Sequence, residues 1–159
     1  IGLKKIKIKI INNKKGDILK FISKKSTFFK SFGEIYFTEI NYKQTKGWNL
    51  HKKNKCLLTV CYGKVVFNFI DGRKKSRSFN KEEKIILDKK NYGIIIVPPG
   101  IWFSFTTKNK ISVVANFLNN SYSDNETLKM NKMKTYIKLK RVSPSRFGHT
   151  FLHFYDFEL

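Results

Sequence analysis

Hydrophobic and polar residues alternate along much of the chain with the period of two that is typical of half-buried β-strands. At residues 5–10 Lys alternates with Ile, which predicts a strand with a basic outer face. Runs rich in β-branched and aromatic residues predict further strands at 18–22, 34–40, 56–60, 64–70, 84–87, 93–97, 101–105 and 111–118. Turn signals, such as Gly63 and the PPG run at 98–100, separate them. Short, regularly spaced strands predict an all-β antiparallel sandwich or barrel.

The composition changes after residue 119. Ser123 and Glu126 have the spacing of a capping box, which predicts a helix over residues 124–140. Residues 129–146 carry seven basic side chains and no acidic one, and residues 147–159 are dense in aromatic side chains. We therefore divide the chain into a barrel, residues 1–122, and a basic helix with an aromatic C-terminal extension, residues 123–159.

The chain of 159 residues has 33 Lys and Arg against 11 Asp and Glu, a formal net charge of +22. Such a surplus favours a polyanionic partner: nucleic acid, an anionic membrane surface or a phosphorylated small molecule. Lys greatly outnumbers Arg, the better reader of bases, so we do not expect nucleic-acid binding. The sequence shows no signal peptide and no apolar run long enough to span a membrane. Its two cysteines, Cys56 and Cys61, do not make a disulfide framework, which predicts reduced thiols in a cytoplasmic protein.

Three stretches carry more information than the rest: GEIYF at 33–37, KGWNLHKK at 46–53 and VPPGIWF at 97–103. On these motifs the sequence resembles the cupin superfamily. Within it, the chain resembles the metal-independent branch that contains dTDP-4-dehydrorhamnose 3,5-epimerases and dTDP-sugar 3,4-ketoisomerases. The resemblance covers roughly residues 16–126 and implies a cupin-like antiparallel β-barrel (jelly roll), here with a C-terminal helical and aromatic extension.

Alternate residues of a strand in a small barrel face its interior. Asn49 and His51 are two residues apart, so both side chains are able to line one cavity, and Tyr36 is able to face the same cavity. Trp102, which follows the Pro-Pro-Gly turn, is placed to form the floor. These residues predict a concave ligand site with aromatic walls.

Metal-binding cupins supply two His separated by one residue, then a Glu and a third His. In this chain the first of these positions is Asn49, no acidic residue follows His51 before Asp71, and the late position is Phe103. A single His does not hold a divalent metal without further ligands. We therefore expect neither a metal nor another cofactor.

The resemblance implies a nucleotide-linked 4-keto-6-deoxy sugar as substrate, used in surface-polysaccharide synthesis, and proton transfer at the carbon next to its ketone. The base of the epimerases, in the pattern Arg-Gly-x-His, falls on Asn49, and their Tyr acid falls near Asn116. The ketoisomerase pattern, Arg-Gly-x-His-x-His, places its second His on His51. We take His51 as the candidate base, Tyr36 as the candidate acid and Asn49 as an amide donor to the enolate oxygen.

Cations and aromatic rings around this site are candidates for binding the nucleotide. Lys46, Lys53 and Arg73 are able to hold a diphosphate, and Trp48 and Trp102 are able to stack on a nucleobase. We add Asn116 as a further substrate-binding residue of the cavity wall.

Two functions remain open at this point. The first is a nucleotide-sugar epimerase or ketoisomerase. The alternative is a degenerate cupin that binds a sugar nucleotide or carbohydrate without turnover, because Asn49, Asn116 and Asn120 stand where titrating groups are expected. Barrels of this kind resemble proteins that exchange edge strands, so we expect a homodimer.

Overall fold

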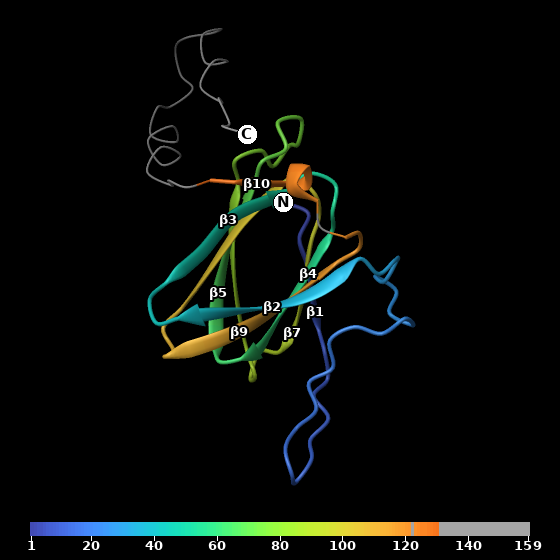
Figure 1. The fold of residues 1–159 in the computed structure, drawn as a ribbon, viewed down its shortest axis with the longest axis vertical. Helices are drawn as coiled ribbons and strands as arrows, with labels where there is room; N and C mark the ends of the chain where they lie inside the picture. Colours follow the sequence, from blue (N-terminus) through green and yellow to red (C-terminus); the bar gives the residue numbers. More distant parts are fainter. Residues whose placement is uncertain (122, 131–159) are drawn as a thin grey trace, which may run out of the picture.

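The computed structural model describes residues 1–121 and 123–130, which form two antiparallel sheets packed face to face (Figure 1). The first sheet has the strand order β1-β7-β4-β9-β2, and the second has the order β10-β3-β8-β5-β6. The strands are β1 (Lys4–Lys7), β2 (Glu34–Asn41), β3 (Thr45–His51), β4 (Cys56–Tyr62), β5 (Lys64–Asp71), β6 (Glu82–Asp88), β7 (Gly93–Val97), β8 (Ile101–Thr107), β9 (Ile111–Leu118) and β10 (Thr127–Lys129). The predicted all-β jelly roll is thus confirmed.

Most predicted strands are present at or close to their expected bounds. The runs at 93–97 and 111–118 match β7 and β9, and the hairpin turn at Gly63 joins β4 to β5 with a positive φ of 82°. β4 pairs with β7 and β9, whereas β5 pairs with β6 and β8. The chain therefore crosses between the sheets at Gly63, which encloses the interior between them.

The N-terminal segment differs from its prediction. The strand expected at 5–10 is the shorter β1, and the strand expected at 18–22 is reduced to a single bridge between Ile11 and Ile18. Figure 1 shows the loop that follows β1, in blue, extending away from the two sheets. The prediction of a strand at 18–22 is wrong. Phe21 and Ile22 pack against the cluster that contains Leu57, Ile94, Ile96 and Phe117, but the segment has no neighbouring strand to pair with along its length.

The helix expected from residue 124 is also absent over the part of it that is described. A single 3-10 turn, η1 (Asp124–Glu126), leads directly into β10, which pairs with β3. Ser123 makes no capping hydrogen bond through its side chain, and the Glu126 carboxylate contacts His51 instead. Tertiary pairing therefore overrides the local capping signal. Residues 131–140 of the predicted helix, like the basic and aromatic extension, lie outside the described residues.

The main core lies between the sheets and is rich in aromatic rings. Phe67, Phe69, Phe103 and Phe105 are all buried there. Phe69 stacks on Phe67 and Phe103 stacks on Phe105, and a tilted contact between Phe67 and Phe105 joins the two pairs, with ring centroids 5.7–6.5 Å apart. A second cluster lies on the outer face of the second sheet and contains Trp48, Leu50, Ile70 and Trp102, packed against Leu128 and Met130. The inner and outer faces of β3 and β8 are therefore both occupied. No helix with the length and apolar character of a membrane span occurs in residues 1–121 and 123–130.

Candidate active site

A cavity of about 210 Å³ lies between the two sheets, on the side where β2 and β3 meet. Ten residues from five strands line it: Tyr36, Thr38, Lys46, Gly47, Asn49, Leu58, Phe103, Phe105, Val114 and Asn116. Tyr36 and Lys46 remain exposed, and they belong to β2 and β3. The cavity therefore opens to solvent between these two strands.

Strand register explains which side chains reach the cavity. Within the first sheet, Tyr36 pairs with Asn116, and Asn116 pairs with Leu58. Within the second sheet, Asn49 pairs with Phe103. Paired residues share one face of a sheet, so these two rows look toward each other across the interior.

The cavity is polar at its mouth and apolar at its depth. Among its ten lining residues, Lys46 alone carries a charge at neutral pH. The deeper wall is formed by Leu58, Phe103, Phe105 and Val114, all of which are buried. The arrangement suits an anionic ligand whose less polar part enters first.

Tyr36 presents a proton donor to the cavity. Burial raises the pKa of its phenol, and nearby Cys56 adds to the effect, so the group stays protonated at neutral pH. The Asn116 amide nitrogen donates a hydrogen bond to the Tyr36 oxygen. Because the phenol accepts in this bond, its own hydrogen can be donated to an oxygen of a ligand.

His51 lies one step further along β3, with its side chain on the same face as Asn49. Its ring is only 5% exposed and stacks on Phe103, with centroids 5.9 Å apart. Its Nδ1 lies 2.6 Å from the Glu126 Oε2. The carboxylate accepts the Nδ1 hydrogen, which leaves the Nε2 of a neutral ring unprotonated and basic.

Hydrogen bonds hold both oxygens of the Glu126 carboxylate. Its Oε1 accepts hydrogen bonds from the backbone nitrogens of Lys53 and Asn54, at 3.0 and 2.8 Å. Burial acts to raise the pKa of Glu126, but these bonds and the contact with His51 outweigh it and lower the pKa. The group is therefore a carboxylate at neutral pH and fixes the orientation of the imidazole.

The sequence missed this carboxylate. Glu126 is 75 residues from His51 along the chain and matched a helix-capping pattern, so it was assigned a local role. Only the return of the chain to β3 through β10 brings the two side chains together.

Four of the expected binding residues lie away from the cavity. Trp48 and Trp102 are each 6% exposed on the outer face of the second sheet, because they neighbour the inward-facing Asn49 and Phe103. The structure therefore places the ring of Phe103, and not that of Trp102, at the floor.

Arg73 and Lys53 are the other two. The Arg73 guanidinium bonds the fully buried Asp71 carboxylate through Nε and a terminal nitrogen, at 2.9 and 2.7 Å, and also bonds the Ile1 carbonyl at 2.7 Å. Lys53 lies in the exposed turn after β3 and bonds Glu126 through its backbone. Of the expected site residues, the cavity is lined by Tyr36, Lys46, Asn49 and Asn116. His51 was expected to line the same cavity but lies outside the lining, stacked on Phe103.

No group of three His, Cys, Asp or Glu side chains in the described part of the chain is arranged to hold a metal ion. The chemistry that the described residues offer is proton transfer: an imidazole oriented by a carboxylate on one sheet and a protonated phenol on the other. Amide and ammonium donors lie between them.

A family model described as dTDP-4-dehydrorhamnose 3,5-epimerase matches residues 44–153, more than half of the chain. No curated protein matches the sequence. The structure is similar to a dTDP sugar isomerase from Desulfovibrio desulfuricans G20, with 26% identity, a TM-score of 0.82 and coverage of 86% of this chain and 88% of the other.

Two further solved structures share the fold. One is the dTDP-6-deoxy-D-glucose-3,5-epimerase of Legionella pneumophila Philadelphia 1 in complex with dTDP-4-keto-L-rhamnose, with 19% identity, a TM-score of 0.74 and coverage of 84% of this chain and 74% of the other. The other is the dTDP-4-dehydrorhamnose 3,5-epimerase of Sulfolobus tokodaii, with 22% identity, a TM-score of 0.75 and coverage of 82% and 78%.

Proposed function

Because the chain belongs to the dTDP-4-dehydrorhamnose 3,5-epimerase family, we propose that it is a nucleotide-sugar epimerase that uses His51 as its base. The substrate class is a dTDP-linked 4-keto-6-deoxyhexose, and the reaction removes and returns a proton at a carbon next to the ketone. The observation that carries the proposal is the buried imidazole held by the Glu126 carboxylate at 2.6 Å, on the cavity-facing side of β3.

The group that removes the proton and the group that returns one lie on opposite sheets. The His51 Nε2 takes the hydrogen from the carbon, and Glu126 stabilises the imidazolium that forms. The negative charge that develops on the ketone oxygen is stabilised by the Asn49 amide and the Lys46 ammonium. Tyr36 then returns a proton from the opposite wall, which inverts the carbon, and solvent restores both groups.

This assignment favours turnover over binding alone. Asn49, Asn116 and Asn120 take no proton, but the pair formed by His51 and Glu126 supplies a base that does not depend on them. The reaction needs no metal, because amide, phenol and ammonium donors supply the stabilisation that a Lewis acid would otherwise give.

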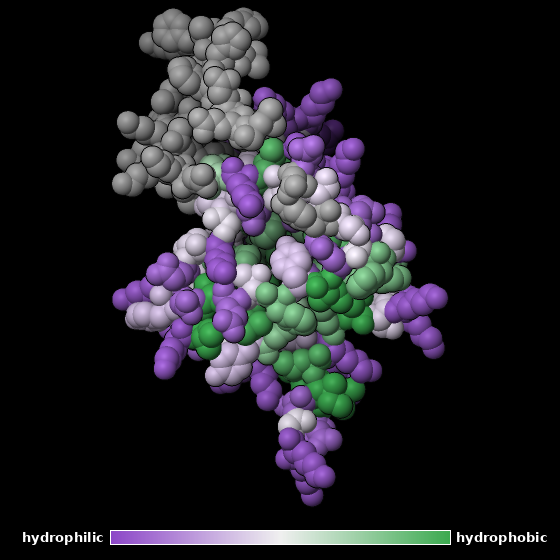
Figure 2. Space-filling view, viewed as in Figure 1, coloured by the Kyte–Doolittle hydropathy of each residue, from purple (hydrophilic) through white to green (hydrophobic). Residues whose placement is uncertain are grey.

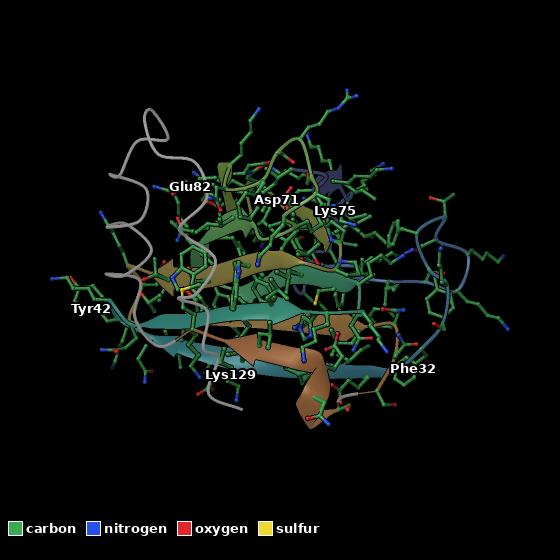
Figure 3. The ribbon with its side chains drawn as sticks, turned by 90° about the horizontal axis from the view of Figure 1, so that it is seen from above. Phe32, Tyr42, Asp71, Lys75, Glu82 and Lys129 are labelled. Atoms are coloured by element: carbon green, nitrogen blue, oxygen red, sulfur yellow. The ribbon has the colours of Figure 1, made fainter. Side chains whose placement is uncertain are left out.

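We also propose that the enzyme acts as a homodimer that pairs through β2, the last strand of its sheet. Phe37 is 67% exposed on this strand, and Phe32 and Tyr42, which lie near its two ends in Figure 3, are 65% and 51% exposed. On the face shown in Figure 2, apolar surface gathers in the region where Figure 1 places β2. A second copy that covers this edge strand would also cover the mouth of the cavity beside it.

Light scattering after size-exclusion chromatography tests the dimer. We expect the mass of two chains for the wild type and of one chain for Phe37→Lys, which places a charge in the interface. A monomeric wild type contradicts the dimer but leaves the assignment of His51 in place.

Deuterium incorporation tests the catalytic proposal. The wild-type enzyme in D2O should exchange hydrogen next to the ketone of a dTDP-4-keto-6-deoxyhexose. His51→Asn should lose exchange by about 100-fold or more while still binding dTDP in calorimetry. Lys52→Asn, a change at the exposed neighbouring position, is the matched control and should retain exchange. Full exchange in His51→Asn, or none in the wild type, overturns the proposal.

A further inference from the structure

A phenylalanine ring contacts both the cavity and the imidazole of His51. His51 is not among the ten residues that line the cavity, although Asn49, two residues earlier on the same face of β3, is. Phe103 lines the cavity and also stacks on the imidazole at 5.9 Å. Its ring is 2% exposed and continues into a stack with Phe105 at 6.5 Å.

From this geometry we propose that Phe103 is the specificity-determining gate of the site: its ring must turn aside before His51 reaches the sugar. The inference rests on the proposed function and deepens it. A ligand exposes the imidazole only if its sugar ring enters far enough to displace the phenyl ring. Ligands that bind at the polar mouth alone, through Lys46 and Asn49, leave the base covered.

The physical chemistry of the floor suits such a role. A phenyl ring makes no hydrogen bond, so turning it breaks none, and aromatic rings in a stack keep favourable contacts over a range of offsets. A hydrogen bond ties the Tyr36 side chain to that of Asn116, whereas of the four apolar residues of the deeper wall Phe103 is the one whose ring also contacts the imidazole. While the ring is in place it also keeps water from the base.

The reactivity of His51 toward diethyl pyrocarbonate tests the gate without substrate. The reagent acylates an unprotonated ring nitrogen, and Glu126 occupies Nδ1, so the reaction reports access to Nε2. Modification is followed by mass spectrometry on the peptide that contains His51. We expect slow modification in the wild type and at least fivefold faster modification in Phe103→Leu.

Phe105→Leu is the matched control. It removes the same atoms from the same strand and the same cavity, but Phe105 makes no ring contact with His51 among the described residues. Its His51 should react within twofold of the wild-type rate. Equal acceleration in both variants, or none in Phe103→Leu, overturns the gate. If Phe103→Leu fails to fold, Phe103→Met provides the same comparison with a smaller loss of volume.

The gate and the catalytic assignment fail separately. If access follows Phe103 but His51→Asn retains exchange, the gate stands and the base is elsewhere. If His51→Asn abolishes exchange but Phe103→Leu leaves access unchanged, the base stands and the gate is refuted.

Discussion

Replacing Glu126 by Gln tests whether the carboxylate orients a base or only ties the fold together. The change swaps Oε2 for an NH2 group and leaves an oxygen at the Oε1 position. That oxygen can still accept the backbone hydrogen bonds from Lys53 and Asn54, at 3.0 and 2.8 Å. On the other side, the new N–H donors face the His51 Nδ1, which the carboxylate approaches to 2.6 Å.

Glu126→Gln should affect stability much less than it affects catalysis. The lost bond is charge-assisted, and such bonds contribute about 1.5–3 kcal/mol, of which the amide recovers part by donating to Nδ1. We therefore expect the free energy of unfolding to fall by only about 1 kcal/mol. The imidazole, however, must now accept at Nδ1 and carry its hydrogen on Nε2, so it cannot take a proton. The corresponding change in a Ser-His-Asp triad lowers kcat by about 10⁴, and we expect a loss of about 10²–10⁴ in exchange.

Deuterium exchange and denaturant unfolding, measured on the same preparation, separate the two effects. The loss should appear in kcat, with little change in KM, because Glu126 does not line the cavity. Glu126→Ala serves as the contrasting variant, since it also removes the backbone bonds and should cost more stability than Glu126→Gln. Exchange within threefold of wild type in a folded Glu126→Gln protein would refute the role of the carboxylate.

Three further changes test other parts of the structure. Tyr36→Phe should lower exchange by about 100-fold with little change in KM, because it removes only the proton donor; exchange close to wild type would exclude the phenol as the acid. Burial acts to raise the pKa of Asp71, but hydrogen bonds from Arg73 and two serines outweigh it and hold the pKa below its usual range. The stability that this carboxylate contributes is therefore present above about pH 4 and is lost as the pH falls further. Asp71→Asn should therefore make the free energy of unfolding depend less on pH in the acid range. Urea titrations that give the same pH dependence for the variant and the wild type would contradict this prediction. Ser104 has a buried hydroxyl without a hydrogen-bond partner among the described residues. Ser104→Ala should therefore leave the free energy of unfolding unchanged or raise it by up to about 1 kcal/mol. A clear drop in the thermal midpoint of the variant would contradict this prediction.

The strands could be predicted because their signal is local. The runs at 93–97 and 111–118 contain enough β-branched and aromatic residues to mark a buried strand without any knowledge of their partners. The segment at 18–22 has the same composition but lacks a partner along its length, and pairing is not visible in a local pattern. β10 is the opposite case. Its three residues carry only a weak strand signal, but they form a strand because they pair with the edge of β3.

The same distinction applies to the candidate site. Spacing by two correctly places Asn49 and His51 on one face, and the register of β2 and β9 adds Tyr36 and Asn116. The spacing does not say which of two neighbours faces inward, so Trp102 was expected where Phe103 lies. A one-residue difference exchanges the two faces of a strand, and this is decided by the packing of both sheets.

The proposed base, His51, lies two residues beyond the usual position of the His, and this displacement explains two other features of the site. In the epimerase pattern that the chain resembles, the His would occupy the position of Asn49 on the cavity wall. His51 is on the same face but about 7 Å further along β3, and it is only 5% exposed. An imidazolium formed there is shielded from bulk water, so a buried counter-charge is required to stabilise it, and Glu126 provides this charge. At the same level the Phe103 ring stacks on the imidazole and lines the cavity. The contact of the imidazole with the Glu126 carboxylate and its contact with the Phe103 ring are thus both consequences of one change: the His lies two residues further along β3.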